Sequence, residues 1–133
     1  MTRTIVASAV GMVLLTGNLS AGQEVFKSAF HDFRLTTVAD GLVNPWSMAW
    51  LPDGDMLIAE RPGRLRIVRD GKLLPDPVPG VPAVFAEGQG GLFDVLPHPD
   101  FAANRLLYLS YARPQGDGST TAVIRGRFEN DRL

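Results

Sequence analysis

The strongest constraint on the fold is a repeating alternation of short apolar runs and tight-turn signals. Apolar runs at residues 47–51, 56–60 and 64–69 are separated by Pro52-Asp53-Gly54-Asp55 and by Arg61-Pro62-Gly63. Glycine after aspartate or proline favours a hairpin turn, because glycine adopts the positive φ that such turns require. The pattern predicts an antiparallel meander of three strands.

The same pattern returns after a proline-rich segment at residues 74–82. The second set of apolar runs covers residues 92–96, 106–111 and 122–128, with a turn at Gly116-Asp117-Gly118. The pairs Leu51-Pro52 and Leu96-Pro97 hold the same place in the two sets, about 45 residues apart. Small antiparallel sheets that repeat at about 40 to 50 residues are typical of β-propeller blades. The sequence therefore predicts an all-β fold.

The length of the chain limits how much of a propeller it can form. Propellers have about 4 to 8 blades, and even four blades need about 180 residues. The chain has 133 residues, so we predict the N-terminal two blades or so of a larger propeller, and thus a fragment. Strands at 56–59 and 106–109 are apolar on both faces, as expected between neighbouring blades. A complete β-sandwich of two sheets is the alternative.

The first residues have the order of an export signal. Arg3 supplies a positive charge, the run from Ile5 to Leu15 is apolar, and small or polar residues follow up to Gly22. This run is shorter than the about 20 residues that cross a bilayer. We expect a signal peptide at 1–22, a partial propeller domain at 23–133, and a periplasmic or secreted protein with no membrane attachment after cleavage.

Composition excludes several function classes. The 13 basic and 14 acidic residues give a net charge of -1, so no long-range field attracts nucleic acid. No P-loop, dinucleotide fingerprint, nucleophile elbow or zinc spacing is present, which argues against nucleotide and nicotinamide chemistry. The chain has no cysteine, so its stability depends on packing rather than on disulfides.

Three local features have structural explanations. Asp53-Gly54-Asp55 resembles part of a calcium loop but lacks the remaining oxygen ligands, so we expect a hairpin turn and no metal site. Trp46 and Trp50 are expected to pack within or between blades, with sugar stacking as a second option. A basic cluster is interpreted as a solvated strand edge that blocks strand addition. Its members are Arg61, Arg64, Arg66 and Arg69.

Four ordered segments add a resemblance to a known family. Residues 41–54 read GLVNPWSMAWLPDG, and residues 60–65 read ERPGRL. Residues 88–95 read GQGGLFDV, and residues 98–101 read HPDF. In this order the segments resemble the N-terminal part of the soluble glucose/sorbosone dehydrogenases, also called aldose sugar dehydrogenases, over about residues 33–133.

The resemblance implies a six-bladed propeller in the periplasm or outside the cell, with pyrroloquinoline quinone and calcium. The implied reaction oxidises an aldose at its anomeric carbon to a lactone, and a downstream electron acceptor then takes the electrons. By the same resemblance Gln89 lies beside the substrate, and its amide can donate to and accept from a sugar hydroxyl. The flanking Gly88, Gly90 and Gly91 would allow a sharp turn and a close approach to a ligand.

The family's catalytic histidine has no counterpart in the chain, so no catalytic residue is assigned. His98 lies in a Pro-His-Pro-Asp turn, where we expect it to bond nearby backbone, and His31 precedes the first meander without a partner. The resemblance places the calcium ligands and the arginine and asparagine contacts to the quinone in later blades. The 133-residue chain is therefore expected to be inactive alone. A non-catalytic propeller or sandwich that binds carbohydrate or protein is the rival hypothesis.

Overall fold

The computed structural model describes residues 24–133, so the predicted signal peptide lies outside the described residues. The chain divides into two units at Thr36–Thr37. In the first unit, β1 (Val25–Phe26) and β2 (Phe33–Arg34) form a short antiparallel hairpin in which the rings of Phe26 and Phe33 stack 5.5 Å apart. Within residues 24–133, no helix combines the length and the apolar character needed to span a bilayer.

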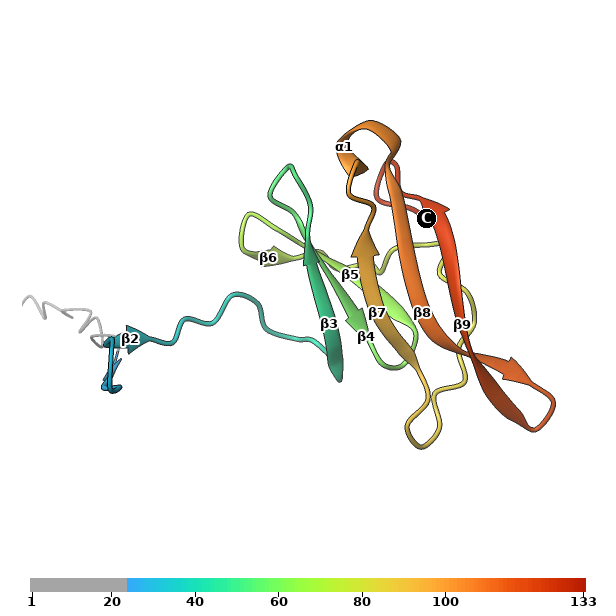
Figure 1. Cartoon of the computed structure of the whole chain (residues 1–133), viewed down its shortest axis with the longest axis horizontal. Coiled ribbons are helices and arrows are strands. Elements are labelled where there is room, and N and C mark those ends of the chain that lie inside the picture. Colours follow the sequence, from blue (N-terminus) through green and yellow to red (C-terminus); the bar gives the residue numbers. More distant parts are fainter. Residues whose placement is uncertain (1–23) are drawn as a thin grey trace, which may run out of the picture. The chain divides into compact units, whose positions relative to one another are not determined.

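The second unit begins with a four-stranded antiparallel sheet, which is green in Figure 1. Its strands, in order, are β3 (Pro45–Trp50), β4 (Met56–Glu60), β5 (Arg64–Arg69) and β6 (Lys72–Leu73). The Pro-Asp-Gly segment forms the predicted turn, with Gly54 at φ 94° and its N–H donating to the carbonyl of Leu51 over 3.0 Å. The first meander is therefore confirmed, and β6 is a fourth strand that the sequence pattern did not reveal.

The second sheet is also antiparallel and has three strands. They are β7 (Leu92–Pro97), β8 (Leu106–Gln115) and β9 (Gly118–Arg127), in that order. Gln115 pairs with Gly118, and Gly116 has φ 54°, so a two-residue turn joins β8 to β9. The meander is confirmed, but its two long strands extend beyond the predicted runs. A one-turn helix, α1 (Phe101–Asn104), follows β7 and was not predicted.

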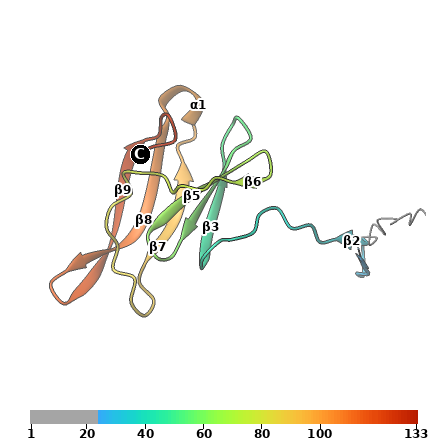
Figure 2. The same ribbon diagram turned by 180° about the vertical axis from the view of Figure 1, so that it is seen from behind.

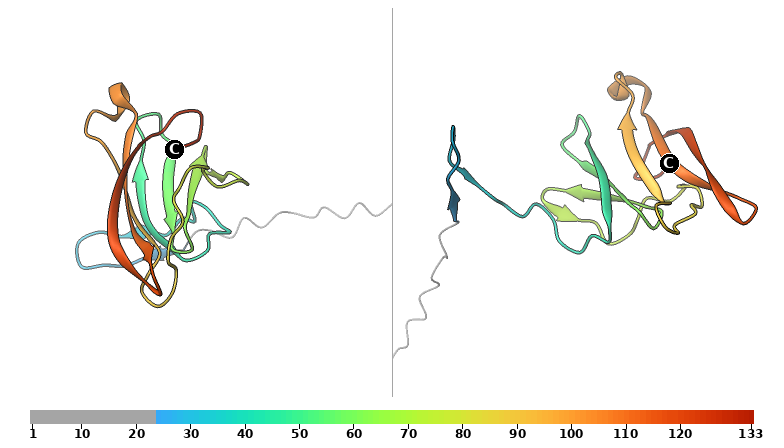
Figure 3. Two further views of the ribbon diagram at one scale, coloured as in Figure 1. Left: turned by 90° about the vertical axis from the view of Figure 1, so that its right-hand side faces the viewer. Right: turned by 60° about the horizontal axis from the view of Figure 1, so that its bottom comes forward.

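The two sheets bury a common apolar core. Both views of Figure 3 show the green strands of the first sheet on one side and the orange and red strands of the second on the other. Leu57 and Leu65 of the first sheet and Leu92 and Leu107 of the second are each 0% exposed in this core. Ser47 of β3 joins the sheets, because its Oγ donates to the carbonyl of Phe93 over 2.8 Å and accepts from the N–H of Val95.

The outer face of the first sheet is only partly covered. Met56, Ile58 and Val68 form a small second cluster there. On the edge strand β3, Trp46 and Trp50 are 54% and 59% exposed, although Trp46 lies 6.1 Å from the ring of Phe93. Trp46 therefore packs between the two sheets in part, as expected, whereas no contact of Trp50 with the second sheet is found within residues 24–133.

The apolar strands differ in how completely they are buried. Every residue of β4 is buried, as predicted for a strand covered on both faces. In β8, Leu107 and Leu109 are fully buried, whereas Leu106 and Tyr108 are half-buried. The prediction of burial on both faces thus holds for β4 and only in part for β8.

The long connection between β6 and β7 crosses from one sheet to the other, as Figure 2 shows. Val78 donates to the carbonyl of Leu65 in β5 over 2.8 Å, and Phe85 donates to the carbonyl of Ala112 in β8 over 2.9 Å. The connection ends in a loop before β7, at the same end of the sheets as the β4–β5 turn (Figure 1).

Candidate functional site

The predicted substrate residue Gln89 lies in a tight turn in the loop before β7. The N–H of Gly90 donates to the carbonyl of Glu87 over 2.7 Å, and Gly88 has φ 54°. The Gln89 side chain is exposed and makes no hydrogen bond within residues 24–133. Its amide is thus free to bind a ligand from solvent.

Arg61, in the turn between β4 and β5, holds this loop from the side. Its Nη1 lies 2.9 Å from the carbonyl oxygen of Gly88, 3.3 Å from that of Ala86 and 3.4 Å from that of Gly90. The contact with Gly88 is the shortest of the three. It fixes the peptide bond that leads directly into Gln89.

The backbone of Arg61 is anchored as well. Its N–H donates to the carbonyl of Asn44 over 2.9 Å, and its carbonyl accepts from the N–H of Leu92 over 3.0 Å. Arg61 therefore links the segment before β3 to the first residue of β7. The guanidinium and the peptide groups of one residue together connect the two sheets beside the Gln89 turn.

The glycines of the loop serve protein contacts. A Cβ at Gly91 would clash with the backbone and side chain of Arg61, and a Cβ at Gly90 would clash with the carbonyl of Phe85. Gly91 also has φ 150°, which glycine adopts most readily. Glycine at these two positions is required by close packing within the chain, whereas a Cβ at Gly88 would meet open space.

The residue before Arg61 belongs to a different network. Glu60 is 0% exposed, accepts from the N–H of Val43 over 2.6 Å and pairs with the Nε of Arg64 at 2.5 Å. Arg66 lies 3.6 Å from the same carboxylate and donates to the carbonyl of Leu74. Burial alone would raise the pKa of Glu60, but the hydrogen bonds from Val43 and Arg64 and the two positive charges outweigh it and hold the pKa below its ordinary value.

Arg69 is occupied by two carboxylates. It contacts Asp55 at 2.6 Å and Asp131 at 2.8 Å. Hydrogen bonds to Asp55, and then to Asp131, raise the pKa of Arg69, and the hydrogen bond from Arg69 lowers the pKa of Asp131. The interpretation of the basic cluster as a solvated strand edge is wrong, because β5 is an inner strand and these arginines are engaged by oxygen atoms of the chain.

Each of the two histidines makes its contacts within its own local segment. The Nδ1 of His98 accepts from the N–H of Asp100 over 3.0 Å and lies 2.8 Å from the amide nitrogen of Asn104. His98 thus bonds its own turn, as the sequence indicated. His31 is exposed in the first unit, where its carbonyl and N–H contact the hydroxyl of Ser28.

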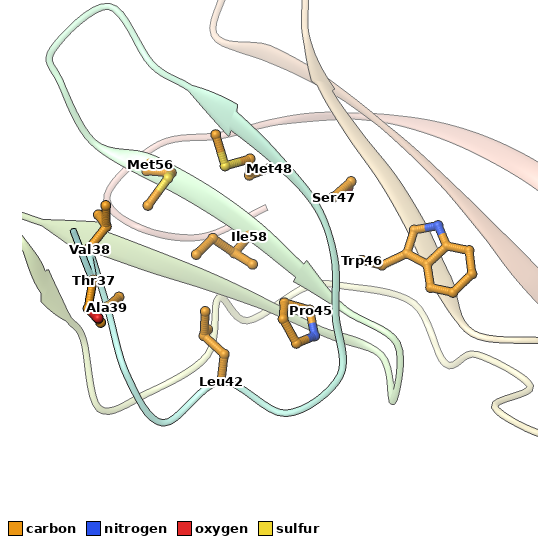
Figure 4. A pocket seen from close by; sticks show the side chains of 10 residues that line it. All are labelled: Thr37, Val38, Ala39, Leu42, Pro45, Trp46, Ser47, Met48, Met56 and Ile58. Carbon is orange, nitrogen blue, oxygen red and sulfur yellow. The ribbon is translucent and has the colours of Figure 1, made fainter. Parts of the chain in front are cut away.

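An apolar groove of about 470 Å³ lies on the outer face of the first sheet. In Figure 4 the side chains of Met48, Met56 and Ile58 lie together in it, and Trp46 points away from them. Of its two hydroxyl-bearing residues, Ser47 is already bonded to β7. The groove offers few polar groups to orient a sugar. In this respect it differs chemically from the Gln89 turn, which exposes a free amide.

The described residues hold no group of three or more side chains suited to a metal ion. Asp53 accepts from the N–H of Asp55 over 3.2 Å, and the carboxylate of Asp55 is bound to Arg69. The Asp-Gly-Asp segment is therefore a turn whose carboxylates have partners within the chain.

Sequence reasoning predicted a substrate contact for Gln89, and it missed Arg61 as the residue that holds the Gln89 loop. Arg61 was grouped with the arginines of β5 because they are close in sequence. The sequence did contain one signal that sets Arg61 apart: it lies in the Arg-Pro-Gly turn, so its side chain does not follow the alternation of the strand residues. Its partners are carbonyl groups about 25 to 29 residues further along the chain, and no local pattern predicts backbone acceptors.

Comparisons with known proteins show the family of the chain. Residues 42–133 match the family described as Glucose / Sorbosone dehydrogenase. The chain is 50% identical over 94 residues to the aldose sugar dehydrogenase YliI of Escherichia coli, covering 69% of this chain and 25% of the relative.

Solved structures show the same similarity. A glucose dehydrogenase matches with a TM-score of 0.68 and 54% identity, over 72% of this chain and 30% of its own. The PQQ-bound aldose sugar dehydrogenase of Streptomyces coelicolor matches with a TM-score of 0.64 and 28% identity, over 74% and 28%. The chain thus spans less than a third of the length of the relatives it matches. The prediction of an all-β propeller portion is confirmed.

Proposed function

The chain belongs to the glucose/sorbosone dehydrogenase family, and we propose that it forms part of an exported oxidoreductase that oxidises an aldose at its anomeric carbon to a lactone. The hydride acceptor in this proposal is pyrroloquinoline quinone, which is bound in the structure of the Streptomyces coelicolor relative. The electrons pass on to a downstream acceptor. Export to the periplasm or beyond follows from the signal-like residues 1–22 and belongs to the same proposal.

The observation that carries the proposal is the free amide of Gln89 in a glycine turn, within a segment that matches the family. Sugars present hydroxyl groups that both donate and accept hydrogen bonds. The NH₂ group of a primary amide donates and its carbonyl oxygen accepts, so the amide can pair with a hydroxyl in either role. We infer that Gln89 binds a hydroxyl of the aldose that does not react. Its contribution is then to hold the sugar rather than to move a proton.

The polar clusters of the first sheet do not fit the quinone or calcium. The quinone carries carboxylates and would need cationic partners, but three arginines of this sheet, Arg61, Arg64 and Arg69, are already bonded to oxygen atoms of the chain. Calcium would need several free oxygen ligands, and residues 24–133 hold no group of three or more His, Cys, Asp or Glu side chains that could bind a metal ion. No catalytic step is therefore assigned to this part of the protein.

The overall reaction removes a hydride from the anomeric carbon and a proton from its hydroxyl. A general base must accept that proton. His98 has its Nδ1 occupied by its own turn, and His31 lies in the separate N-terminal unit, so neither is proposed for this role. We accordingly propose that the 133-residue chain is inactive without further parts of the enzyme.

The test is an oxidation assay on the protein expressed from the complete reading frame, with the quinone, calcium and an artificial electron acceptor. The proposal predicts lactone formation from an aldose, with electrons delivered to the acceptor only after loading with the quinone. The 133-residue chain under the same conditions is the control and should give no turnover. Sugar binding without oxidation by the loaded full-length protein would contradict the proposal and favour a non-catalytic carbohydrate-binding propeller.

A further inference from the structure

We propose that Arg61 is the positioning residue of the sugar site: it sets the conformation of the loop from Ala86 to Gly90 so that Gln89 faces the substrate. The inference rests on the proposed function, since it concerns the same site. It assigns no proton transfer and no contact with the sugar to Arg61. The residue acts through the loop that it holds.

The two ends of the loop are fixed by one residue of β8. Ala112 accepts from the N–H of Phe85 over 2.9 Å and donates to the carbonyl of Gly91 over 2.8 Å. Between these anchors the backbone closes one turn, from Glu87 to Gly90. The backbone hydrogen bonds to β8 therefore define where the loop starts and ends, but they leave the orientation of its tip open.

Arg61 supplies the contact that the tip lacks. Its half-buried side chain brings Nη1 within 2.9 Å of the Gly88 carbonyl, with the carbonyls of Ala86 and Gly90 at 3.3 and 3.4 Å. A charged donor forms stronger hydrogen bonds to carbonyl groups than a neutral one. Because the Gly88 carbonyl belongs to the peptide bond of Gln89, this contact limits rotation of the residue that carries the exposed amide.

Glycine at position 91 makes this arrangement possible. A Cβ there would occupy the space of the Arg61 side chain and backbone. Arg61 thus contacts the loop at two places: its guanidinium group bonds the Gly88 carbonyl, and its backbone and side chain pack closely against Gly91. The remaining arginines of the basic cluster have carboxylate partners, whereas the hydrogen-bond partners of the Arg61 side chain within residues 24–133 are all carbonyls of this one loop.

Loss of this contact should weaken sugar binding more than turnover. If Gln89 binds a hydroxyl that does not react, a misdirected amide removes an interaction present in both the ground state and the transition state. The Michaelis constant then rises while kcat changes little. The loss of one such hydrogen bond corresponds to about a tenfold change.

The experiment uses the full-length enzyme with the variants Arg61→Gln and Arg61→Lys. Arg125→Lys is the matched control, because Arg125 is exposed on β9 and its side chain has no hydrogen bond or ion pair within residues 24–133. Aldose kinetics are measured together with amide hydrogen exchange of a peptide covering residues 85–93 and with the melting temperature. The exchange readout does not depend on catalysis.

We expect Arg61→Gln to raise the KM for the aldose about tenfold, with kcat within about twofold of the wild type. Exchange should quicken in residues 86–90 alone. Arg61→Lys keeps a charged donor and should recover part of both effects, and the control should change neither.

Three results would overturn the inference. Unchanged exchange in Arg61→Gln would show that the arginine does not hold the loop. Faster exchange with an unchanged KM would show that the loop does not serve the sugar. A parallel loss of kcat and melting temperature, with exchange quickened across both sheets, would reduce Arg61 to a general structural role. A quinone-loaded wild type that neither binds nor oxidises any aldose would instead overturn the proposed function, and the inference with it.

Discussion

Glu60 and Arg61 are neighbours in the chain, but they build two different polar networks. Glu60 is fully buried, and its carboxylate is enclosed by Val43, Arg64 and Arg66. Arg61 is half-buried and bonds carbonyls of a loop whose tip carries the exposed Gln89. The first network closes on itself, and the second ends in a free polar group.

The difference teaches how one strand end can serve both stability and binding. A buried carboxylate is tolerated only when its charge and hydrogen bonds are matched, so the Glu60 network stabilises the sheet. Arg61 contributes its positive charge to neutral acceptors and leaves the Gln89 amide unbonded. An unbonded, exposed amide adds little to folding and is available to a ligand.

The largest expected effect comes from breaking the closed network with Glu60→Gln. The substitution leaves Arg64 and Arg66 without their carboxylate, and we expect the free energy of unfolding to fall by about 2 to 4 kcal/mol. Denaturant unfolding of the protein measures it. Glu129→Gln is the control, because its ion pair with Arg127 is more than half exposed and should contribute almost nothing. Equal losses in both variants would contradict the distinction.

A smaller effect is expected for Gly91→Ala, at the position where the Gln89 loop packs against Arg61. The added methyl group would clash with Arg61 at a φ that alanine disfavours, and we expect a loss of about 1 to 3 kcal/mol. Gly116→Ala also has a positive φ but meets open space, so its loss should be smaller. Melting temperatures of the two variants test the ranking, and a reversed order would show that crowding against Arg61 is unimportant.

The smallest effect is a loss of stability in acid. The pKa values of Glu60 and Asp131 are lowered in the folded state, from ordinary values of 4.5 and 3.8. Such groups stabilise the fold above their unfolded pKa, and this contribution is lost as the pH falls through the folded pKa. Stability from this source should be constant between pH 7 and about 5 and decline below about 4. A Glu60→Gln variant that declines as steeply as the wild type would contradict the role of Glu60.

The sequence predicted the two meanders because hairpin turns and strand periodicity are local signals. Asp53-Gly54 and Gly116-Asp117 lie in turns as expected. The two-residue strand β6 was missed because Lys72 and Leu73 are too few to show a period. Helix α1 was missed for the same reason, since it has only four residues. In addition, the left-handed residue that ends it is Arg105, and arginine is not a typical helix-ending residue.

The candidate site was predictable only in part. Gln89 was identified through the family resemblance, because an exposed amide in a glycine-rich segment has no distinctive physical signal by itself. The pairing of arginines with distant partners depends on strand register and on the crossing connection, as with Asp131 and Arg69. Those contacts arise from tertiary structure and leave no local pattern in the sequence.

The account depends most directly on Gln89 binding the sugar. The decisive measurement is the aldose KM of the full-length enzyme carrying Gln89→Ala, with Gln115→Ala, an exposed glutamine at the β8–β9 turn, as the matched control. We predict that Gln89→Ala raises the KM about tenfold at an unchanged melting temperature, because one hydrogen bond to the sugar is lost. A KM equal to that of the wild type and of the control would contradict the account.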